Sequence, residues 1–253
     1  MPSGWTPSTY DGRDIEFAVR RDVVTPPRAM LRHPFAVRDQ GEVPCCVSVA
    51  IATCMEILDA RRGRAIELSS LFHYFCSRVD PSELKLLDPR TALRAASTTG
   101  LCRRDLHDPT CDAAGAAARP SEEAFADAEN QRLAGYDPSA MRMQYSVMTG
   151  SIVESCRNAL ARGVPVIVAF WVTSAYRAIS AGRPTHGPPP AEASEEGHAV
   201  AVIGYDDTME VFHVKDSRGA GFGQRGLWRM PYSVMSSRLV HEAWALERIQ
   251  YDA

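Results

Sequence analysis

The stretch Val37-Arg-Asp-Gln-Gly-Glu-Val-Pro-Cys-Cys-Val-Ser-Val-Ala-Ile51 carries the strongest structural signal in this 253-residue sequence. Apolar side chains recur at helical spacing from Val47 to Leu58, and the Arg-Arg-Gly that ends at Gly63 provides a basic last turn and a C-cap. The pattern predicts a helix that begins beside Cys45 and Cys46. A helix N-terminus stabilises the thiolate, the nucleophilic form of a cysteine. Free cysteines are more often small buried hydrophobes, so other motifs must decide their role.

The rest of the chain divides into three parts around this helix. Residues 1–39 contain five prolines and little periodicity, which predicts an extended arm with a short strand at Ile15–Val19. Residues 40–150 are mainly helical in pattern, whereas residues 151–253 are mainly β-rich segments separated by turns. We therefore expect a single α+β domain with a helical lobe and a β lobe.

Capping residues and apolar runs indicate the other elements. Further helices are expected after Ser69 and Ser70, over Thr91–Ser97, from Pro120 to Gly135 and over Ser151–Ala161. Strands are expected over Val164–Val172, His198–Tyr205, Glu210–Lys215, Gly226–Met230 and Ala243–Ile249, as a small antiparallel sheet or barrel. Residues 177–196 contain two glycines and a triple proline, which predicts an irregular loop. The loop either is a simple connection, acts as a lid or sets specificity.

Composition and charge argue against several classes of protein. The formal charge is -3, with 28 basic and 31 acidic side chains, so no cationic surface is expected to bind nucleic acid. No apolar run approaches the roughly 20 residues that span a bilayer, so we expect no membrane integration. The N-terminus lacks a signal-peptide pattern, and the seven cysteines lack paired spacing. A cytoplasmic, reducing compartment without obligatory disulfides is therefore predicted. The sequence does not indicate an oligomeric state.

Two other kinds of site are rejected on context. The glycines from Gly219 to Gly226 follow a strand like a dinucleotide fingerprint, but the next residues reach Pro231 as a strand and do not open a helix. The cysteines and histidines lack the paired spacing of zinc ligands. We therefore expect neither a cofactor nor a metal.

Three motifs together carry a family resemblance. They are Gln40-Gly41 six positions before Cys46, Gly197-His198-Ala199-Val200 at the start of an apolar strand, and Val214-Lys-Asp216-Ser217-Arg-Gly219-Ala-Gly221-Phe-Gly223 after the next strand. This set resembles the papain-like (C1) cysteine peptidases, in the style of bacterial members without a propeptide. In that family the histidine and asparagine lie roughly 130–150 residues after the nucleophile. Here the distances are 152 and 170 residues, and loop 177–196 accounts for the excess.

The resemblance implies a papain-like two-lobe fold, with a helical N-terminal lobe, an antiparallel β-barrel-like C-terminal lobe and the active site in the cleft between them. It implies that Cys46 is the nucleophile, His198 the general base and acid, Asp216 the residue that orients the imidazole, and Gln40 an oxyanion donor. Cys45 is a second candidate nucleophile or a resolving partner, but the spacing from Gln40 favours Cys46.

The activity implied by the resemblance is hydrolysis of a peptide or amide bond through a thioester on Cys46, with a peptide, protein or acyl-amide as substrate. Two alternatives stay open, because a fold does not determine a function. One is a papain-like acyltransferase or transpeptidase that acts on a biosynthetic or protein acyl substrate. The other is an inactive papain-like binding module.

Several positions differ from the family pattern. They are Asp216 for the family's asparagine, Arg218 for its shielding tryptophan, Val47 for the aromatic residue after the nucleophile and Val43 for a disulfide cysteine, and residues 78–95 lack its Cys-Gly-Gly segment. These differences predict a charged orienting residue and a wetter site, and they leave ordinary endopeptidase binding unsupported. Only 39 residues precede Gln40, too few for the family's inhibitory propeptide, so control of activity is expected to come from elsewhere.

Overall fold

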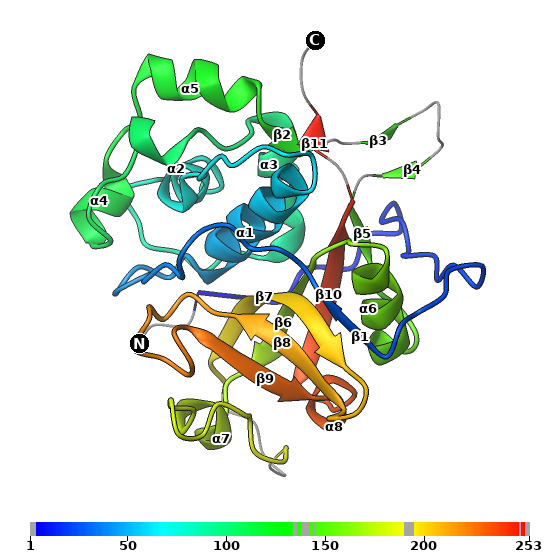
Figure 1. Cartoon of the computed structure of the whole chain (residues 1–253). Coiled ribbons are helices and arrows are strands. Elements are labelled where there is room, and N and C mark those ends of the chain that lie inside the picture. Colours follow the sequence, from blue (N-terminus) through cyan, green and yellow to red (C-terminus); the bar gives the residue numbers. More distant parts are fainter. Residues whose placement is uncertain are drawn as a thin grey trace.

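The computed structural model describes residues 4–133, 136–137, 142–143, 145–189, 195–247 and 249–250. Figure 1 shows α1 to α5 gathered on one side of a sheet, with α6 beside the sheet itself. The helices are α1 Cys46–Ala60, α2 Ser70–Cys76, α3 Pro89–Thr98, α4 Ala113–Ala117, α5 Glu122–Glu129, α6 Ile152–Ala161, α7 Ser174–Arg177 and α8 Tyr232–Met235, with a 3-10 turn at Arg104–Leu106. The strands are β1 Arg28–Met30, β2 Arg132–Leu133, β3 Tyr136–Asp137, β4 Arg142–Met143, β5 Tyr145–Val147, β6 Val166–Trp171, β7 Gly197–Asp206, β8 Val211–Lys215, β9 Leu227–Pro231, β10 Val240–Leu246 and β11 Ile249–Gln250.

Helix α1 is the central element of the fold. Every residue from Cys46 to Asp59 is buried, so other elements of the fold must pack against every face of this helix. It packs against β6 and β7 of the sheet and against α2 and α3 of the helical lobe. Its start at Cys46 and its end at Ala60 agree with the sequence prediction. No helix in the described part of the chain is long and apolar enough to cross a membrane.

The main sheet is antiparallel, and its strands run in the order β5-β10-β6-β7-β8-β9, with β1 also paired to β7. The register pairs His198 at the start of β7 with Phe170 of β6, and Ala201 of β7 with Lys215 of β8. Because β8 ends at Lys215, the next residue, Asp216, lies beside the beginning of β7. The pairing of these two strands therefore brings His198 and Asp216 to the same end of the sheet.

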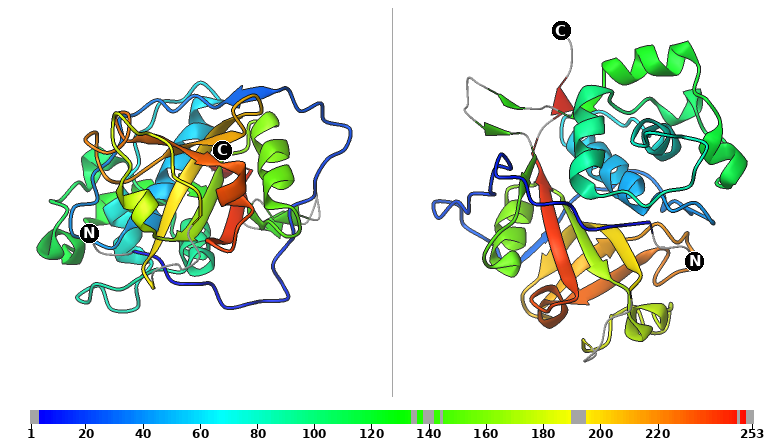
Figure 2. Two further views of the ribbon diagram at one scale, coloured as in Figure 1. Left: turned by 90° about the horizontal axis from the view of Figure 1, so that it is seen from below. Right: turned by 180° about the vertical axis from the view of Figure 1, so that it is seen from behind.

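The N-terminal arm is part of the core as well as a wrap around it. In Figure 2 the dark blue arm starts near the boundary between helices and sheet and runs round the molecule before α1. Its side chains Trp5 and Phe17 are buried in the hydrophobic core. Further along, β1 pairs with the far end of β7, where Met30 lies opposite Gly204.

Most predicted elements are present with small shifts of their ends, but two expectations are wrong. The helix after Ser121 ends at Glu129 and not at Gly135, a residue outside the described part of the chain. It stops because the chain turns to pair β2 with β11. The expected strand at Ile15–Val19 reduces to one bridge between Glu16 and Val147, because its partner β5 is only three residues long.

A buried ion pair ties the segment before Gln40 to the middle of α1. Arg38 donates to Glu56 through Nη1 at 3.2 Å and Nη2 at 2.5 Å, and Nη2 also donates to the Leu68 carbonyl at 2.8 Å. Glu56 in turn accepts the Leu68 backbone N–H at 2.9 Å. Both charged side chains are buried, so each depends on the other for compensation. The contact fixes the path of the chain into the Gln40 turn.

We expect Glu56→Gln to lower the free energy of unfolding by about 3–5 kcal/mol, because it removes the buried partner of Arg38. The guanidinium then keeps only its longer ion pair, 3.6 Å to the partly exposed Glu67. Urea denaturation followed by circular dichroism measures the change. Asp11→Asn, which removes the exposed Arg13–Asp11 ion pair, is the matched control and should leave stability nearly unchanged. Equal losses for the two variants would contradict the structural importance of the buried pair.

Candidate active site

Cys46 is the first residue of α1 and is fully buried. A tight turn leads to it, in which the Val43 N–H donates to the Gln40 carbonyl at 3.0 Å. Gly41 in this turn has a φ of 54°, and a Cβ there would lie 2.6 Å from the Cys111 carbonyl oxygen, so the turn requires glycine. The turn places the Cys46 sulfur at the positive end of the α1 dipole.

His198 and Asp216 form a buried pair next to Cys46. The His198 Nε2 lies 3.0 Å from Asp216 Oδ1, and the side chains are 4% and 0% exposed. The imidazole also hydrogen-bonds with the side chain of Cys46. The structure therefore brings together three of the predicted site residues, from α1, from β7 and from the turn after β8.

The charges of these groups act against the effect of burial. Burial by itself lowers the pKa of His198, but the charges of Asp216 and Cys46 and the hydrogen bonds to both raise that pKa to about 9. Burial raises the pKa of Asp216, but the charge of His198 and hydrogen bonds to the carboxylate hold that pKa below its ordinary value. At neutral pH the arrangement therefore favours an imidazolium next to a carboxylate.

Asp216 accepts hydrogen bonds on both carboxylate oxygens. Besides His198, its Oδ1 accepts the Ser217 backbone N–H at 2.8 Å. Its Oδ2 accepts the Trp228 indole N–H at 2.6 Å and the Tyr176 hydroxyl at 3.0 Å. The sequence motifs did not identify Tyr176 or Trp228 as contacts of Asp216, because these contacts arise only from the packing of α7 and β9.

Gln40 lies in the same region and is buried. Its Oε1 accepts the Ser217 hydroxyl at 2.5 Å, and its backbone N–H donates to the Ser217 carbonyl at 2.8 Å. Its Nε2 donates to the Val43 carbonyl at 2.9 Å. The amide is therefore oriented from both ends, with its oxygen on Ser217 and its nitrogen toward the turn that leads to Cys46.

The expectation of a wetter site is wrong. His198 and Asp216 are almost fully buried. The Arg218 guanidinium carbon lies 4.8 Å from the centroid of the Tyr176 ring and 5.4 Å from that of Phe222, and the Tyr176 ring lies 5.5 Å from the His198 ring. Arg218 stacked on Tyr176 thus covers the imidazole, although the family's shielding tryptophan is absent.

The N-terminal arm lies directly against Cys46. A Cβ placed on Gly4 would lie 2.7 Å from the Cys46 Sγ. The arm also pairs with Leu87, because the Thr6 N–H donates to the Leu87 carbonyl at 3.1 Å and the Leu87 N–H donates to the Gly4 carbonyl at 3.2 Å. Residues 78–95 therefore provide a backbone edge beside the site, although they lack the motif that the family uses there.

Trp5 fills a pocket of the β lobe next to the start of β7. Its ring centroid lies 4.8 Å from that of Trp171 and 5.5 Å from that of His241, and its Nε1 donates to Glu242 Oε1 at 3.0 Å. A Cβ on Gly197 would lie 1.9 Å from the indole, so only glycine leaves room for this ring. The arm is therefore packed into the site and does not merely pass over it.

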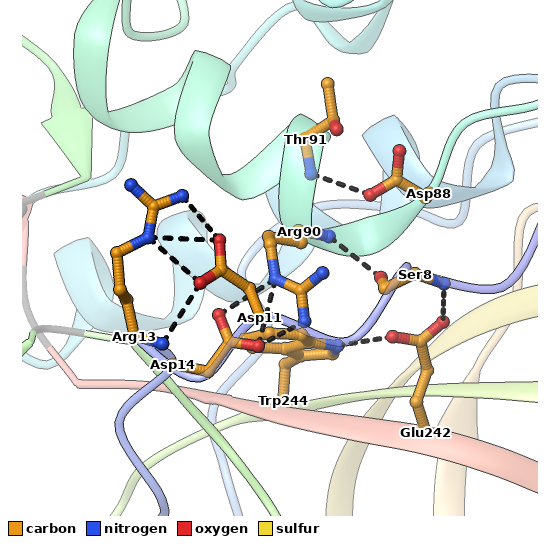
Figure 3. A network of polar contacts seen from close by, with 9 residues as sticks. All are labelled: Ser8, Asp11, Arg13, Asp14, Asp88, Arg90, Thr91, Glu242 and Trp244. Carbon is orange, nitrogen blue, oxygen red and sulfur yellow. Dashed lines mark hydrogen bonds and ion pairs between the residues drawn. The ribbon is translucent and has the colours of Figure 1, made fainter.

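Figure 3 shows polar contacts that hold the arm to both lobes. Arg90 of α3 donates to Asp14 through Nε at 2.8 Å, and its backbone N–H donates to Ser8 Oγ at 3.2 Å. On the sheet side, Glu242 of β10 accepts the Ser8 N–H at 3.0 Å and the Trp244 indole N–H at 2.8 Å. These contacts clamp the arm between α3 and β10.

Cys45 takes part in a different contact from Cys46. It hydrogen-bonds with Cys111, and this contact together with burial raises the pKa of its thiol well above the ordinary value. Such a thiol is a weak nucleophile, which favours Cys46 over Cys45. All seven cysteines are free, and among the described residues no group of three or more His, Cys, Asp or Glu side chains could hold a metal ion.

Part of the loop before His198 packs against β9. Thr185 forms a β-bridge with Arg229, and the His186 N–H donates to the Arg229 carbonyl at 3.0 Å. The His186 ring also contacts the Thr173 hydroxyl at 3.0 Å. Residues 190–194 of the loop lie outside the described part of the chain, and the role of the loop as a lid stays a prediction.

Comparisons with known proteins agree on the fold and on the type of family. A family model described as "Peptidase_C39 like family" matches residues 103–229, just over half of the chain, which includes His198 and Asp216. The "Uncharacterized peptidase C1-like protein L477" of Acanthamoeba polyphaga mimivirus is 24% identical over 239 residues, which cover 90% of this chain and 73% of that protein.

Solved structures with the same fold include xylellain, a cysteine protease from Xylella fastidiosa, with a TM-score of 0.86 at 22% identity over 98% of this chain and 96% of that chain. The digestive procathepsin L 3 of Tenebrio molitor matches with a TM-score of 0.69 at 17% identity over 93% of this chain and 74% of that chain. The predicted α+β fold of papain-like cysteine proteases is confirmed, and so is the prediction of a peptidase family.

Because Trp5 anchors the arm over Cys46, we expect Trp5→Ala to speed the alkylation of Cys46 by iodoacetamide at least about tenfold. Peptide mapping after a short reaction measures labelling at each cysteine. Cys54 and Cys156 are internal controls, since they are buried and burial raises their pKa. Equal acceleration at these two cysteines would mean global unfolding, and an unchanged rate at Cys46 would contradict a covering role for the arm. Tyr10→Ala, on an exposed side chain of the arm, should have little effect.

Proposed function

The chain belongs to the peptidase C39-like family, and we propose that it hydrolyses a peptide or amide bond through an acyl-thioester on Cys46. One observation carries the proposal: a buried imidazole, that of His198, contacts both Cys46 at a helix N-terminus and the Asp216 carboxylate. In this proposal Cys46 is the nucleophile, His198 the general base and acid, and Asp216 the residue that orients the imidazole.

The first half of the proposed reaction transfers an acyl group to sulfur. The Cys46 thiolate attacks the carbonyl carbon, a C–S bond forms, and the carbonyl π electrons move to oxygen. When this intermediate collapses, the C–N bond breaks and the His198 imidazolium gives its proton to the leaving amine. In the second half, neutral His198 takes a proton from water, whose oxygen attacks the thioester. The C–S bond then breaks, which releases a carboxylic acid and restores the Cys46 thiolate next to the imidazolium.

Gln40 is the side chain that we assign to the developing oxyanion, together with the Cys46 backbone N–H. The Ser217 hydroxyl donates a hydrogen bond to the Gln40 amide oxygen, which fixes the orientation of the amide and leaves its nitrogen as the donor. One of its two N–H groups binds the Val43 carbonyl, which leaves the other for a substrate oxygen. One such donor generally contributes roughly 2.7–4 kcal/mol to transition-state stabilisation.

We propose a peptide, protein or acyl-amide as the substrate, with entry after displacement of the arm from the Leu87 edge. We treat residues 1–253 as one catalytic domain, with an arm over 1–39, a mainly helical lobe over 40–150 and a mainly β lobe over 151–253. A cytoplasmic, reducing compartment would keep Cys46 as a free thiol.

The function is tested by incubating the wild-type protein and Cys46→Ala with fluorescein-labelled casein in H2(18)O with a thiol reductant. We expect new peptide carboxyl groups that carry the heavy oxygen in the wild-type sample and none with Cys46→Ala. Glycinamide in the reaction separates the alternatives, because products that carry this amine in place of water would indicate an acyltransferase. No product with either acceptor, from the wild type or from Trp5→Ala, would contradict the proposal and indicate a binding module.

We expect Asp216→Asn to retain measurable activity on casein, because an amide still offers an acceptor to the imidazole. The Asp216 charge, one of the causes that together raise the pKa of His198 to about 9, is lost, so neutral imidazole forms at a lower pH. The alkaline limb of the pH–rate profile should therefore shift to lower pH by about one unit. Complete loss of activity in a folded variant, or an unmoved alkaline limb, would contradict the role given to Asp216.

A further inference from the structure

We infer that Tyr176 and Trp228 are positioning residues that adapt this site to an aspartate, and not an asparagine, as the partner of His198. The inference rests on the proposed function, since it concerns the group that orients the proposed general base. Both residues act through Asp216, because their polar atoms contact its Oδ2.

The hydrogen-bond donors around Asp216 match a carboxylate and not an amide. Its side chain meets four donors: the His198 ring, the Ser217 N–H, the Tyr176 hydroxyl and the Trp228 indole N–H. A carboxylate has about four lone-pair positions and no donor, so it satisfies all of them. An asparagine has one acceptor oxygen and brings an NH2 group, so it cannot satisfy the same set.

An asparagine at position 216 would bring a donor to the place of Oδ2. If an asparagine kept its oxygen toward His198 and Ser217, its NH2 would occupy the place of Oδ2. The Trp228 N–H, which lies 2.6 Å from that place, can only donate, so two donors would face each other. The Tyr176 hydroxyl can rotate and accept a hydrogen bond instead. Trp228 is therefore the residue that discriminates against asparagine.

Burial makes this mismatch costly. Tyr176 and Trp228 are 0% and 2% exposed, so water cannot replace a lost partner at this place. Tyr176 belongs to α7, whose N-cap Thr173 accepts the Tyr176 N–H at 3.0 Å. Burial and the charge of Asp216 raise the pKa of the Tyr176 hydroxyl well above its ordinary value, so the hydroxyl stays protonated across the working pH range.

The donors also affect His198. Each hydrogen bond to the carboxylate shares its negative charge, so the loss of one donor leaves more of that charge for the imidazolium. Removal of the Trp228 N–H or the Tyr176 hydroxyl should therefore raise the pH at which His198 loses its proton. A residue with only a packing role would not move this value.

The test is a double-mutant cycle of Trp228→Phe with Asp216→Asn, with the initial rate on fluorescein-labelled casein measured over the neutral and alkaline range. In the wild-type background we expect Trp228→Phe to lower the rate roughly threefold to tenfold. The alkaline limb of the pH–rate profile should shift to higher pH by about half a unit. In the Asp216→Asn background the same substitution should increase the rate at least about threefold, because it removes the donor that faces the new NH2.

Tyr176→Phe is the comparison within the site. In the wild-type background it should shift the alkaline limb to higher pH. In the Asp216→Asn background it should give no increase in rate, because the Tyr176 hydroxyl accepts a hydrogen bond from the new amide. Tyr232→Phe is the matched control, since the Tyr232 hydroxyl donates at 2.6 Å to Asp207, another carboxylate, beyond the opposite end of β7. It should leave the alkaline limb unmoved.

Equal fold-changes for Trp228→Phe in both backgrounds would overturn the inference, since a tryptophan with only a packing role acts independently of residue 216. A titration of the His198 ring by NMR, assigned with His198→Ala, needs no substrate. If the wild type releases no peptides from casein, the proposed function fails, and this titration still decides the inference: an upward shift in Trp228→Phe supports it and no shift overturns it. If Trp228→Phe does not fold, Tyr176→Phe takes its place in the titration.

Discussion

The candidate site depends on one buried charge, the carboxylate of Asp216. In a water-free interior an ionised group is stable only when donors and an opposite charge replace its hydration. The His198 ring and the Trp228 and Tyr176 side chains donate to this carboxylate. Its charge acts together with the charge of Cys46 and the hydrogen bonds to both groups, and these effects outweigh burial and raise the pKa of His198 to about 9. An imidazolium in this place is the partner that a thiolate of Cys46 needs. Asp216 stands where the family has an asparagine, and the donors around it suit the charge of a carboxylate.

The scaffold brings distant segments of the chain to this charge through backbone constraints. The register of β7 with β8 places His198 beside Asp216, and α1 begins where the Gln40 turn ends. The buried Arg38–Glu56 pair attaches that turn to the middle of α1. The N-terminal arm adds a cover, because Gly4 lies against the Cys46 sulfur and Trp5 is buried next to β7. In the proposed function, substrate access therefore depends on displacement of these residues of the arm.

Much of the site could be predicted from the sequence, because its polar residues stand in local motifs: a glycine turn before a helix, the start of an apolar strand and the turn after the next strand. Cys46 follows a turn that needs glycine, and His198 opens a strand whose apolar run is evident. The contacts of Trp228 and Trp5 could not be predicted, because they depend on tertiary packing between segments more than 10 residues apart. The end of the helix at Glu129 was missed for the same reason, since pairing of β2 with β11 overrides local helix propensity.

The measurement that tests this account most directly is the pH dependence of Cys46 alkylation by limiting iodoacetamide, read by peptide mapping with and without His198→Ala. Both proteins carry Trp5→Ala, which removes the anchor of the arm that covers Cys46. The account predicts selective labelling of Cys46 well below about pH 8.5, the ordinary pKa of a free thiol, and loss of this labelling in His198→Ala. Labelling spread over several cysteines, rising only near that pH and unchanged in His198→Ala, would show that no activated thiolate–imidazolium pair exists and would contradict the account.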